Sequence, residues 1–123
     1  MTQKNFFYFW FPVLLYAGAI FVLSSFPFVF PPALRIRFAD KVIHAVEYGI
    51  LGFLLSRAFL KASSPFFRKS FQAWAIVIAI CYGFTDEIHQ FYVPMRQSSP
   101  VDLLFDGFGA MGAQLFFKRR LLS

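Results

Sequence analysis

The sequence predicts an all-α fold, an integral membrane bundle of four transmembrane helices with both termini in the cytoplasm. Its 123 residues are 59% hydrophobic and only 15% charged, whereas soluble domains are about half apolar and about a quarter charged. A chain of this length has too little interior to hide so much apolar surface from water, so lipid is the solvent that suits it. The length allows one domain, residues 1–123, and no accessory module.

The first predicted span covers residues 6–25, which contain no charged side chain. About 20 helical residues cross the ~30 Å hydrocarbon core of a bilayer. This run is longer than the ~7–15 residues of a signal-peptide core, so we expect a retained helix. Pro27, Pro31 and Pro32 come next and end the helix, because proline lacks an N–H donor. We interpret residues 26–39 as an ordered interfacial loop.

Three further spans are predicted, at residues 40–60, 71–92 and 101–117. Asp40 is a suitable N-cap for the first of them, and a basic loop separates it from the next. The last span has about 17 residues, which is near the minimum for crossing a bilayer. Four segments cannot close a β-barrel, and open strands would leave backbone groups unsatisfied in lipid, so we expect helices.

The distribution of Lys and Arg predicts the orientation, because cytoplasmic loops of membrane proteins are enriched in these residues. One side carries Lys4, Arg57, Lys61, Arg68, Lys69, Lys118, Arg119 and Arg120, and the other carries Arg35, Arg37, Lys41 and Arg96. The richer side holds both termini, which we therefore place in the cytoplasm. The net charge of +6 is explained by topology and by contact with anionic lipid, and it does not indicate a nucleic-acid partner.

The acidic residues and histidines lie toward the opposite side. All six acids and both histidines fall at the outward ends of the second, third and fourth spans: Asp40, Glu47, Asp86, Glu87, Asp102, Asp106, His44 and His89. A helical spacing of four residues aligns Asp40, His44 and Tyr48, then Asp86 and Gln90, then Asp102 and Asp106. We expect these three polar stripes to converge on one pocket open to the outside.

Such groups are expensive in a membrane, at about 2.5–3.5 kcal/mol for each charged side chain on insertion scales, so they generally have a partner or a function. One alternative is that they only satisfy one another and hold the bundle together. A few polar pairs are enough for that purpose, whereas this chain concentrates all of its acids at one end. The concentration therefore favours a functional site.

Two apparent motifs carry no cofactor prediction. Residues 107–112 match G-x-G-x-x-G, but a dinucleotide fingerprint requires a βαβ unit and this segment lies in a predicted span. The pairs His44–Glu47 and Asp86–His89 have the carboxylate–histidine spacing of bundle metal sites. The first pair is reversed, however, and His89 points away from the stripe of Asp86. We therefore predict no metal and no cofactor.

The polar residues resemble the VanZ-like family in three blocks. The blocks are Asp40-Lys41 with His44 and Tyr48; Asp86-Glu87 with Gln90, Pro94 and Arg96; and Asp102 with Asp106, Gly109 and Gly112. The first span is similar only in hydropathy, and Asp106 departs from a pattern in which Asn is common. The resemblance implies a small four-helix, multi-pass protein of the bacterial plasma (inner) membrane, in a family associated with resistance to the glycopeptide teicoplanin.

We predict that the outward pocket binds or processes an anionic envelope lipid or a lipid-linked wall precursor. The candidate binding residues are Asp40, Lys41, His44, Tyr48, Asp86, Glu87, Gln90, Arg96, Asp102 and Asp106. Lys41 and Arg96 would bind phosphate or carboxylate at the rim. An intramembrane hydrolase or transferase is an alternative, with Asp86 or Glu87 as general base and His44 as acid–base partner. A small transporter ranks third, because the cytoplasmic halves of the spans are almost wholly apolar.

Overall fold

The computed structural model describes residues 3–25, 39–93 and 100–117, without the side chains of Gln3, Ala39 and Asp40. The helices are α1 (Gln3–Ser24), α2 (Ala39–Leu60), α3 (Pro65–Lys69), α4 (Phe71–Phe91) and α5 (Pro100–Gly112). No strand occurs in the described ranges, which confirms the predicted all-α class. The interfacial loop predicted at residues 26–39 lies outside them, apart from Ala39 at the start of α2.

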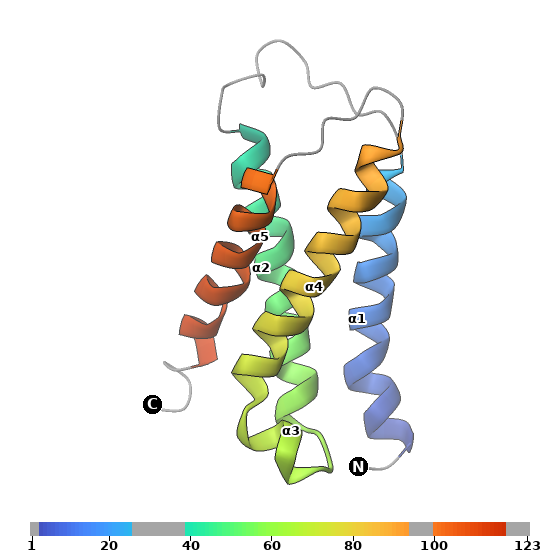
Figure 1. Cartoon of the computed structure of the whole chain (residues 1–123). Helices are drawn as coiled ribbons and strands as arrows, with labels where there is room; N and C mark the ends of the chain where they lie inside the picture. The colour runs from blue at the N-terminus through green and yellow to red at the C-terminus, as the bar shows by residue number, and fades with distance from the viewer. Residues whose placement is uncertain (1–2, 26–38, 94–99, 118–123) are drawn as a thin grey trace.

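The four longer helices run alternately up and down (Figure 1). The C-terminal ends of α1 and α4 lie together with the N-terminal ends of α2 and α5, at the top of the view. We call this the polar end. The start of α1 and the short helix α3 lie at the opposite end, and α5 runs toward that end but stops short of it. The up-and-down order thus gathers the outward ends of the predicted spans on one side of the bundle.

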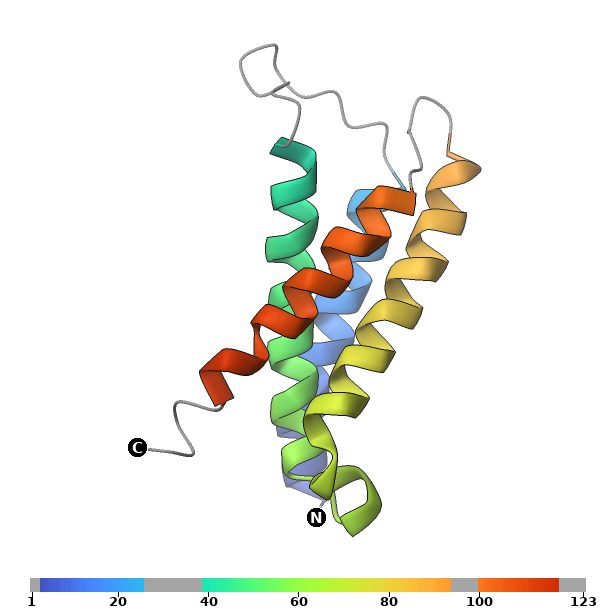
Figure 2. The ribbon, with the colours of Figure 1, turned by 60° about the vertical axis from the view of Figure 1, so that its left-hand side comes forward.

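α2 is the central helix, because it packs against α1, α4 and α5. Its side chains Tyr48, Leu51 and Leu55 are almost completely buried. α5 crosses α2 obliquely, as Figure 2 shows. A Cβ atom added at Gly52 would lie 3.0 Å from the Cα atom of Ala110, so only small residues fit at this crossing. Close approach through small residues is the usual way in which membrane helices pack.

Large apolar side chains cover the outside of the bundle. Phe7, Leu14, Phe84, Phe108 and Leu115 are all more than half exposed, and soluble monomers rarely present so much apolar surface to water. By length and composition, three helical segments of the described chain can cross a membrane: Lys4–Ser24, Lys41–Leu60 and Phe71–Phe91. These segments indicate a multi-pass membrane protein.

The fourth predicted span differs from the structure. α5 ends at Gly112, a turn follows at Ala113, and residues 114–117 are helical again. The amide of Phe116 donates to the carbonyl of Ala113 over 3.3 Å, which is a tighter spacing than that of an α-helix. Glycine is a poor helix former because of its backbone freedom, so Gly112 favours a break here. The 13 residues of α5 alone are about 20 Å long, which is shorter than the ~30 Å hydrocarbon core.

A short helix, α3, replaces part of the basic loop predicted between the second and third spans. Pro65 occupies its first turn, where a missing N–H donor costs nothing. The ring of Phe67 packs against Phe59 of α2 and Trp74 of α4, with centroids 5.8 Å and 5.1 Å apart. α3 therefore closes the end of the bundle that lies away from the polar end.

Candidate functional site

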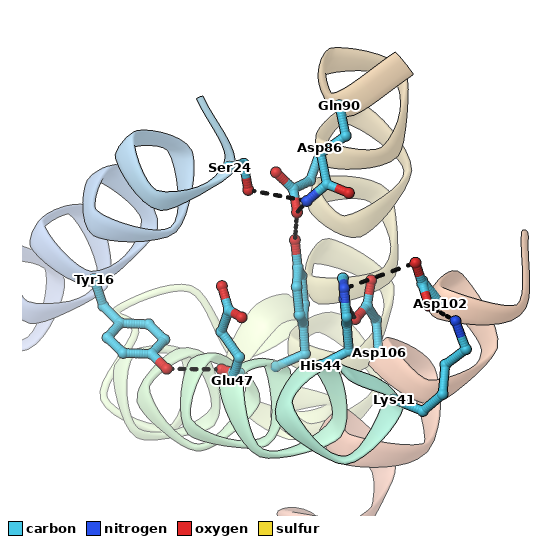
Figure 3. A network of polar contacts seen from close by, with 10 residues as sticks. Tyr16, Ser24, Lys41, His44, Glu47, Asp86, Gln90, Asp102 and Asp106 are labelled. Carbon is cyan, nitrogen blue, oxygen red and sulfur yellow. Dashed lines mark hydrogen bonds and ion pairs between the residues drawn. The ribbon is translucent and has the colours of Figure 1, made fainter. Parts of the chain in front are cut away.

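The polar end contains a cluster of charged and polar side chains from α1, α2, α4 and α5 (Figure 3). We call it the polar cluster, and its described members are Ser24, Lys41, His44, Glu47, Tyr48, Asp86, Glu87, Gln90, Asp102 and Asp106. Most of them are buried, and Asp86, Gln90 and Asp106 are only 5%, 3% and 1% exposed. Carboxylates buried at membrane depth require compensation by partners.

α2 and α5 form one half of the cluster. Lys41 Nζ donates to Asp102 Oδ1 over 2.5 Å, and the two side chains are 17% and 4% exposed. About one turn deeper, His44 Nδ1 lies 2.9 Å from Asp106 Oδ1. The other ring nitrogen, Nε2, lies 3.8 Å from Asp102 Oδ2. The predicted stripes on these two helices therefore face each other.

α4 joins the second half of the cluster to α2 and α1. The hydroxyl of Tyr48 donates to Asp86 Oδ2 over 3.2 Å. Gln90 Nε2 donates to the same carboxylate oxygen over 3.5 Å and to Ser24 Oγ over 3.3 Å. The Asp86–Gln90 stripe predicted on the third span thus faces the bundle interior, where it meets a serine from α1 that the sequence did not single out.

Glu87 extends from α4 toward the α2–α5 half. One carboxylate oxygen of Glu87, one ring nitrogen of His44 and one carboxylate oxygen of Asp106 lie within 4.8 Å of one another. Glu87 is 7% exposed and Asp106 is 1% exposed. Three different helices thus bring together three side chains of the types that ligate metal ions.

Small residues allow the helices to approach closely enough for these contacts. A Cβ atom at Gly109 of α5 would lie 1.9 Å from the carbonyl oxygen of Ala45, which follows His44 in α2. A Cβ atom at Gly83 of α4 would lie 2.9 Å from Asp106 Oδ2. The glycines are therefore required by backbone-to-backbone packing in the first case and by the buried carboxylate in the second.

The polar cluster carries more negative than positive side chains. Its described carboxylic acids are Glu47, Asp86, Glu87, Asp102 and Asp106. Among the described residues of the polar end, Lys41 is the only Lys or Arg, and it contacts Asp102. The described part of the cluster therefore favours a ligand that brings positive charge or hydrogen-bond donors to the carboxylates.

Two of the predicted binding residues are not placed in the cluster. Arg96 lies outside the described residues. Asp40 is the second residue of α2, inside the helix and not at its predicted N-cap, and its side chain is not described. His89 faces away from the cluster, as the helical spacing predicted. Its Nε2 atom lies 2.9 Å from Ser25 Oγ, and its ring stacks on Phe21 with centroids 4.5 Å apart.

The contribution of α1 was missed in the sequence. The hydroxyl of Tyr16 donates to the backbone carbonyl of Glu47 over 3.0 Å, and Ser24 is 2% exposed beside Gln90. The available signal was their spacing, because Tyr16 and Ser24 are about two helical turns apart and share one face of an otherwise apolar span.

A second, uncharged polar group lies nearer the opposite end. Ser56 Oγ donates to Gln114 Oε1 over 2.7 Å, and Gln72 Nε2 donates to the carbonyl of Gln114 over 3.3 Å. Gln114 Nε2 also donates to the carbonyl of Ala110 over 3.1 Å. These bonds satisfy backbone groups where α5 breaks. They were missed because isolated Ser and Gln residues do not stand out within apolar runs.

Comparison with known proteins gives one result that matters for identity. No curated protein and no solved structure matches this chain. A family model described as VanZ/LLP1 matches residues 2–122, essentially the whole chain. The match extends the resemblance seen in the three polar blocks to the first span as well. The chain therefore belongs to the VanZ/LLP1 family.

Proposed function

We propose that the polar cluster binds the headgroup of an envelope lipid or of a lipid-linked wall precursor. The observation that carries this proposal is the burial of four carboxylates, Asp86 and Glu87 of α4 and Asp102 and Asp106 of α5, at one end of a membrane bundle. Among the described residues there, Lys41 is the only Lys or Arg, and it contacts Asp102. Ionisable side chains are costly inside a membrane and generally have a partner or a function, and their concentration at one end favours a function.

Exposed apolar side chains lie on the helices that form the cluster, within two residues of its members. Val42, Ile88, Phe91, Leu104 and Phe108 are 47–72% exposed, and each is close in sequence to a member of the cluster. A ligand with a hydrocarbon tail would lie against these side chains while its headgroup reached the carboxylates. This combination favours an amphipathic ligand over a water-soluble one.

The charged residues would divide the headgroup between them. Lys41 and Arg96 would bind its phosphate or carboxylate, since Arg can do so bidentately and Lys as a point charge. Asp86 and Glu87 would accept hydrogen bonds from its hydroxyls or amines. Both of these carboxylates are on α4 and are buried, so they would contact the inner part of the headgroup.

We further propose that the polar end faces outward from a bacterial plasma membrane. The described Lys and Arg residues away from it are Lys4, Arg57, Lys61, Arg68 and Lys69, and such enrichment is typical of the cytoplasmic side. Residues 100–117 would complete a fourth span, in which α5 supplies about 20 Å and the helical residues 114–117 extend it beyond the turn at Ala113. A reporter that is active only in the cytoplasm should work at both termini, and silence at either terminus would overturn this orientation.

Lipid mass spectrometry of the purified protein tests the binding proposal. The wild type should retain one class of lipid far above its abundance in the membrane. The double variant Lys41→Ala/Arg96→Ala should retain at least about tenfold less, because one lost charge-assisted hydrogen bond is worth about 1.5–3 kcal/mol. Arg96→Ala is measured alone as well, since loss of Lys41 also breaks the ion pair with Asp102.

The matched control removes two positive charges at the other end of the bundle. Arg68 and Lys69 are exposed on α3, and the variant Arg68→Ala/Lys69→Ala should retain the lipid as the wild type does. If the wild type and both site variants retain the same lipids in the same amounts, the headgroup proposal is wrong and the polar cluster serves to hold the helices together.

An intramembrane hydrolase or transferase is a second candidate. The contact of 2.9 Å between His44 Nδ1 and Asp106 Oδ1 favours it, because a buried carboxylate that orients a histidine is a common arrangement for proton transfer. Asp86 or Glu87 would then act as the general base. Turnover of a labelled envelope lipid by the purified protein would support catalysis, whereas tight lipid retention without turnover would favour binding alone.

At the level of the family, membership links the chain to glycopeptide resistance. Teicoplanin susceptibility tests whether this chain contributes. Expression of the wild type should lower susceptibility if the polar cluster is responsible, and expression of Arg96→Ala at the same level should not. Equal susceptibility with and without the wild type would separate the lipid proposal from resistance.

A further inference from the structure

We infer that His44, Glu87 and Asp106 form a binding site for a divalent metal cation. The three side chains come from α2, α4 and α5, and one ligand atom of each lies within 4.8 Å of the other two. The sequence disfavoured a metal because the order of the His44–Glu47 pair is reversed and His89 points away from the stripe of Asp86. The structural group takes a single residue from each of three helices, so no spacing in the sequence displays it.

The distances suit metal coordination after small side-chain movements. Ligands bound at about 2.0–2.2 Å to a single ion lie roughly 3.0–3.5 Å apart for bond angles between 90° and tetrahedral. His44 Nδ1 and Asp106 Oδ1 are already 2.9 Å apart. The side chain of Glu87 is longer than that of Asp106, and rotation about its torsions can bring its carboxylate closer to the His44–Asp106 pair. One imidazole and two carboxylates form a mixed nitrogen–oxygen set that suits Zn²⁺, Mn²⁺ or Fe²⁺.

A second observation at Asp106 points independently to a ligand. The side chain of Asp106 is 0% exposed, and its Oδ2 atom is buried without a hydrogen-bond partner among the described residues. This oxygen faces α4, where a Cβ atom at Gly83 would lie 2.9 Å from it. Glu87 is one turn further along the same stripe of α4. An unsatisfied buried acceptor costs about 1–3 kcal/mol, and a cation bound between Asp106 and Glu87 would offset that cost.

The charge of the polar cluster also favours a cation. Within the polar cluster, five carboxylic acids are described and Lys41, which contacts Asp102, is the only described Lys or Arg. A divalent ion would balance the carboxylates of Glu87 and Asp106. It would also offer an open coordination position to a phosphate oxygen of the headgroup. This contact with the headgroup rests on the proposed function, whereas metal binding itself does not.

Metal titration of the purified protein, without added lipid, tests the inference. The affinity tag is removed, the protein is dialysed against a chelator, and Zn²⁺ and Mn²⁺ are added separately in equilibrium dialysis with elemental analysis. The wild type should bind one ion per chain. His44→Gln, Glu87→Gln and Asp106→Asn should each weaken binding at least about 100-fold, because even residues that only orient metal ligands cost about 10–100-fold.

His89→Gln is the matched control, because His89 is a possible metal ligand at the same end of the bundle but contacts Ser25 and is not part of the group. It should bind the ion as the wild type does. Glu87→Gln keeps the test valid if Asp106→Asn does not fold, as judged by size-exclusion chromatography. Absence of stoichiometric binding to the wild type, or an equal loss in His89→Gln, would overturn the metal site. Lipid retention measured on the same preparations separates this failure from failure of the lipid proposal.

Discussion

Replacing Gly109 with alanine should separate α5 from α2 and break the polar cluster. A Cβ atom at this position would lie 1.9 Å from the carbonyl oxygen of Ala45, and real Cβ atoms essentially never come within 3.0 Å of such an atom. The difference between these distances means that the helices must move apart by about 1.1 Å. The obstructing atom belongs to the backbone of α2, so no side-chain rotation can relieve the clash.

This displacement acts directly on the neighbouring polar contact, because Ala45 follows His44 and Gly109 is three residues after Asp106. The His44–Asp106 distance of 2.9 Å would grow to about 4.0 Å, beyond hydrogen-bonding range. Overpacking costs about 1–3 kcal/mol, and the lost interhelical contact adds roughly 1 kcal/mol. We expect Gly109→Ala to reduce the free energy of unfolding by about 2–4 kcal/mol.

Reversible unfolding in mixed detergent micelles measures this free energy. Gly112→Ala is the matched control, because it lies in the same helix and a Cβ atom there meets nothing within 4 Å. The control should unfold within about 0.5 kcal/mol of the wild type, or slightly later through better helix propensity. Equal stability of the two variants would refute the packing that we describe between α2 and α5.

Two further substitutions test the two halves of the cluster. Lys41→Met should destabilise the protein by about 3–5 kcal/mol, because it removes the Lys41 ion pair from the buried carboxylate of Asp102. Adding Asp102→Asn should recover more than half of that loss in the same unfolding assay. A loss that is not recovered would contradict the pairing. Tyr48→Phe removes the hydrogen-bond donor to Asp86 and should lower the free energy of unfolding by about 1–3 kcal/mol. Tyr92→Phe, at a side chain that is 77% exposed, should leave it unchanged. Equal effects of the two substitutions would contradict a buried Tyr48–Asp86 bond.

The helical class could be predicted from sequence because the physical signal is strong and local. Long apolar runs such as residues 6–25 need lipid, and lipid demands helices. The start of α2 at Ala39 and of α4 at Phe71 lies within about one residue of the predicted positions. The break after Gly112 could not be foreseen, because a glycine in a helical pattern is tolerated or not according to packing elsewhere.

The residues of the site could be predicted from sequence, but the residues that they contact on other helices could not. Spacing aligned His44 with Tyr48 and Asp102 with Asp106, and it gave the direction of His89. Which stripe faces which helix depends on the crossing of α2 and α5, and so on backbone contacts that no single-helix pattern contains. For example, the sequence predicts that Lys41 binds a ligand at the rim of the pocket, whereas Lys41 contacts Asp102 in the structure.

The contacts of α1 and the grouping of His44, Glu87 and Asp106 could not be predicted from sequence for a different reason. Ser24 is an ordinary residue within an apolar run, and it gains meaning only when Gln90 is brought within 3.3 Å of it. Glu87 was singled out as a possible base, but its closeness to both His44 and Asp106 arises from three helices at once. Pairwise spacing within one helix cannot reveal a site of this kind.

An experimental structure of the protein in discs of native membrane lipid would test most directly whether the polar cluster is a ligand site. Our proposal predicts density for a lipid headgroup in contact with Asp86 or Glu87 on the inner side and with Arg96 on the outer side. The hydrocarbon tail should lie against exposed residues such as Ile88 or Phe91. Carboxylates that contact only protein groups and water, with no bound headgroup at the polar end, would contradict the proposal and favour a structural role.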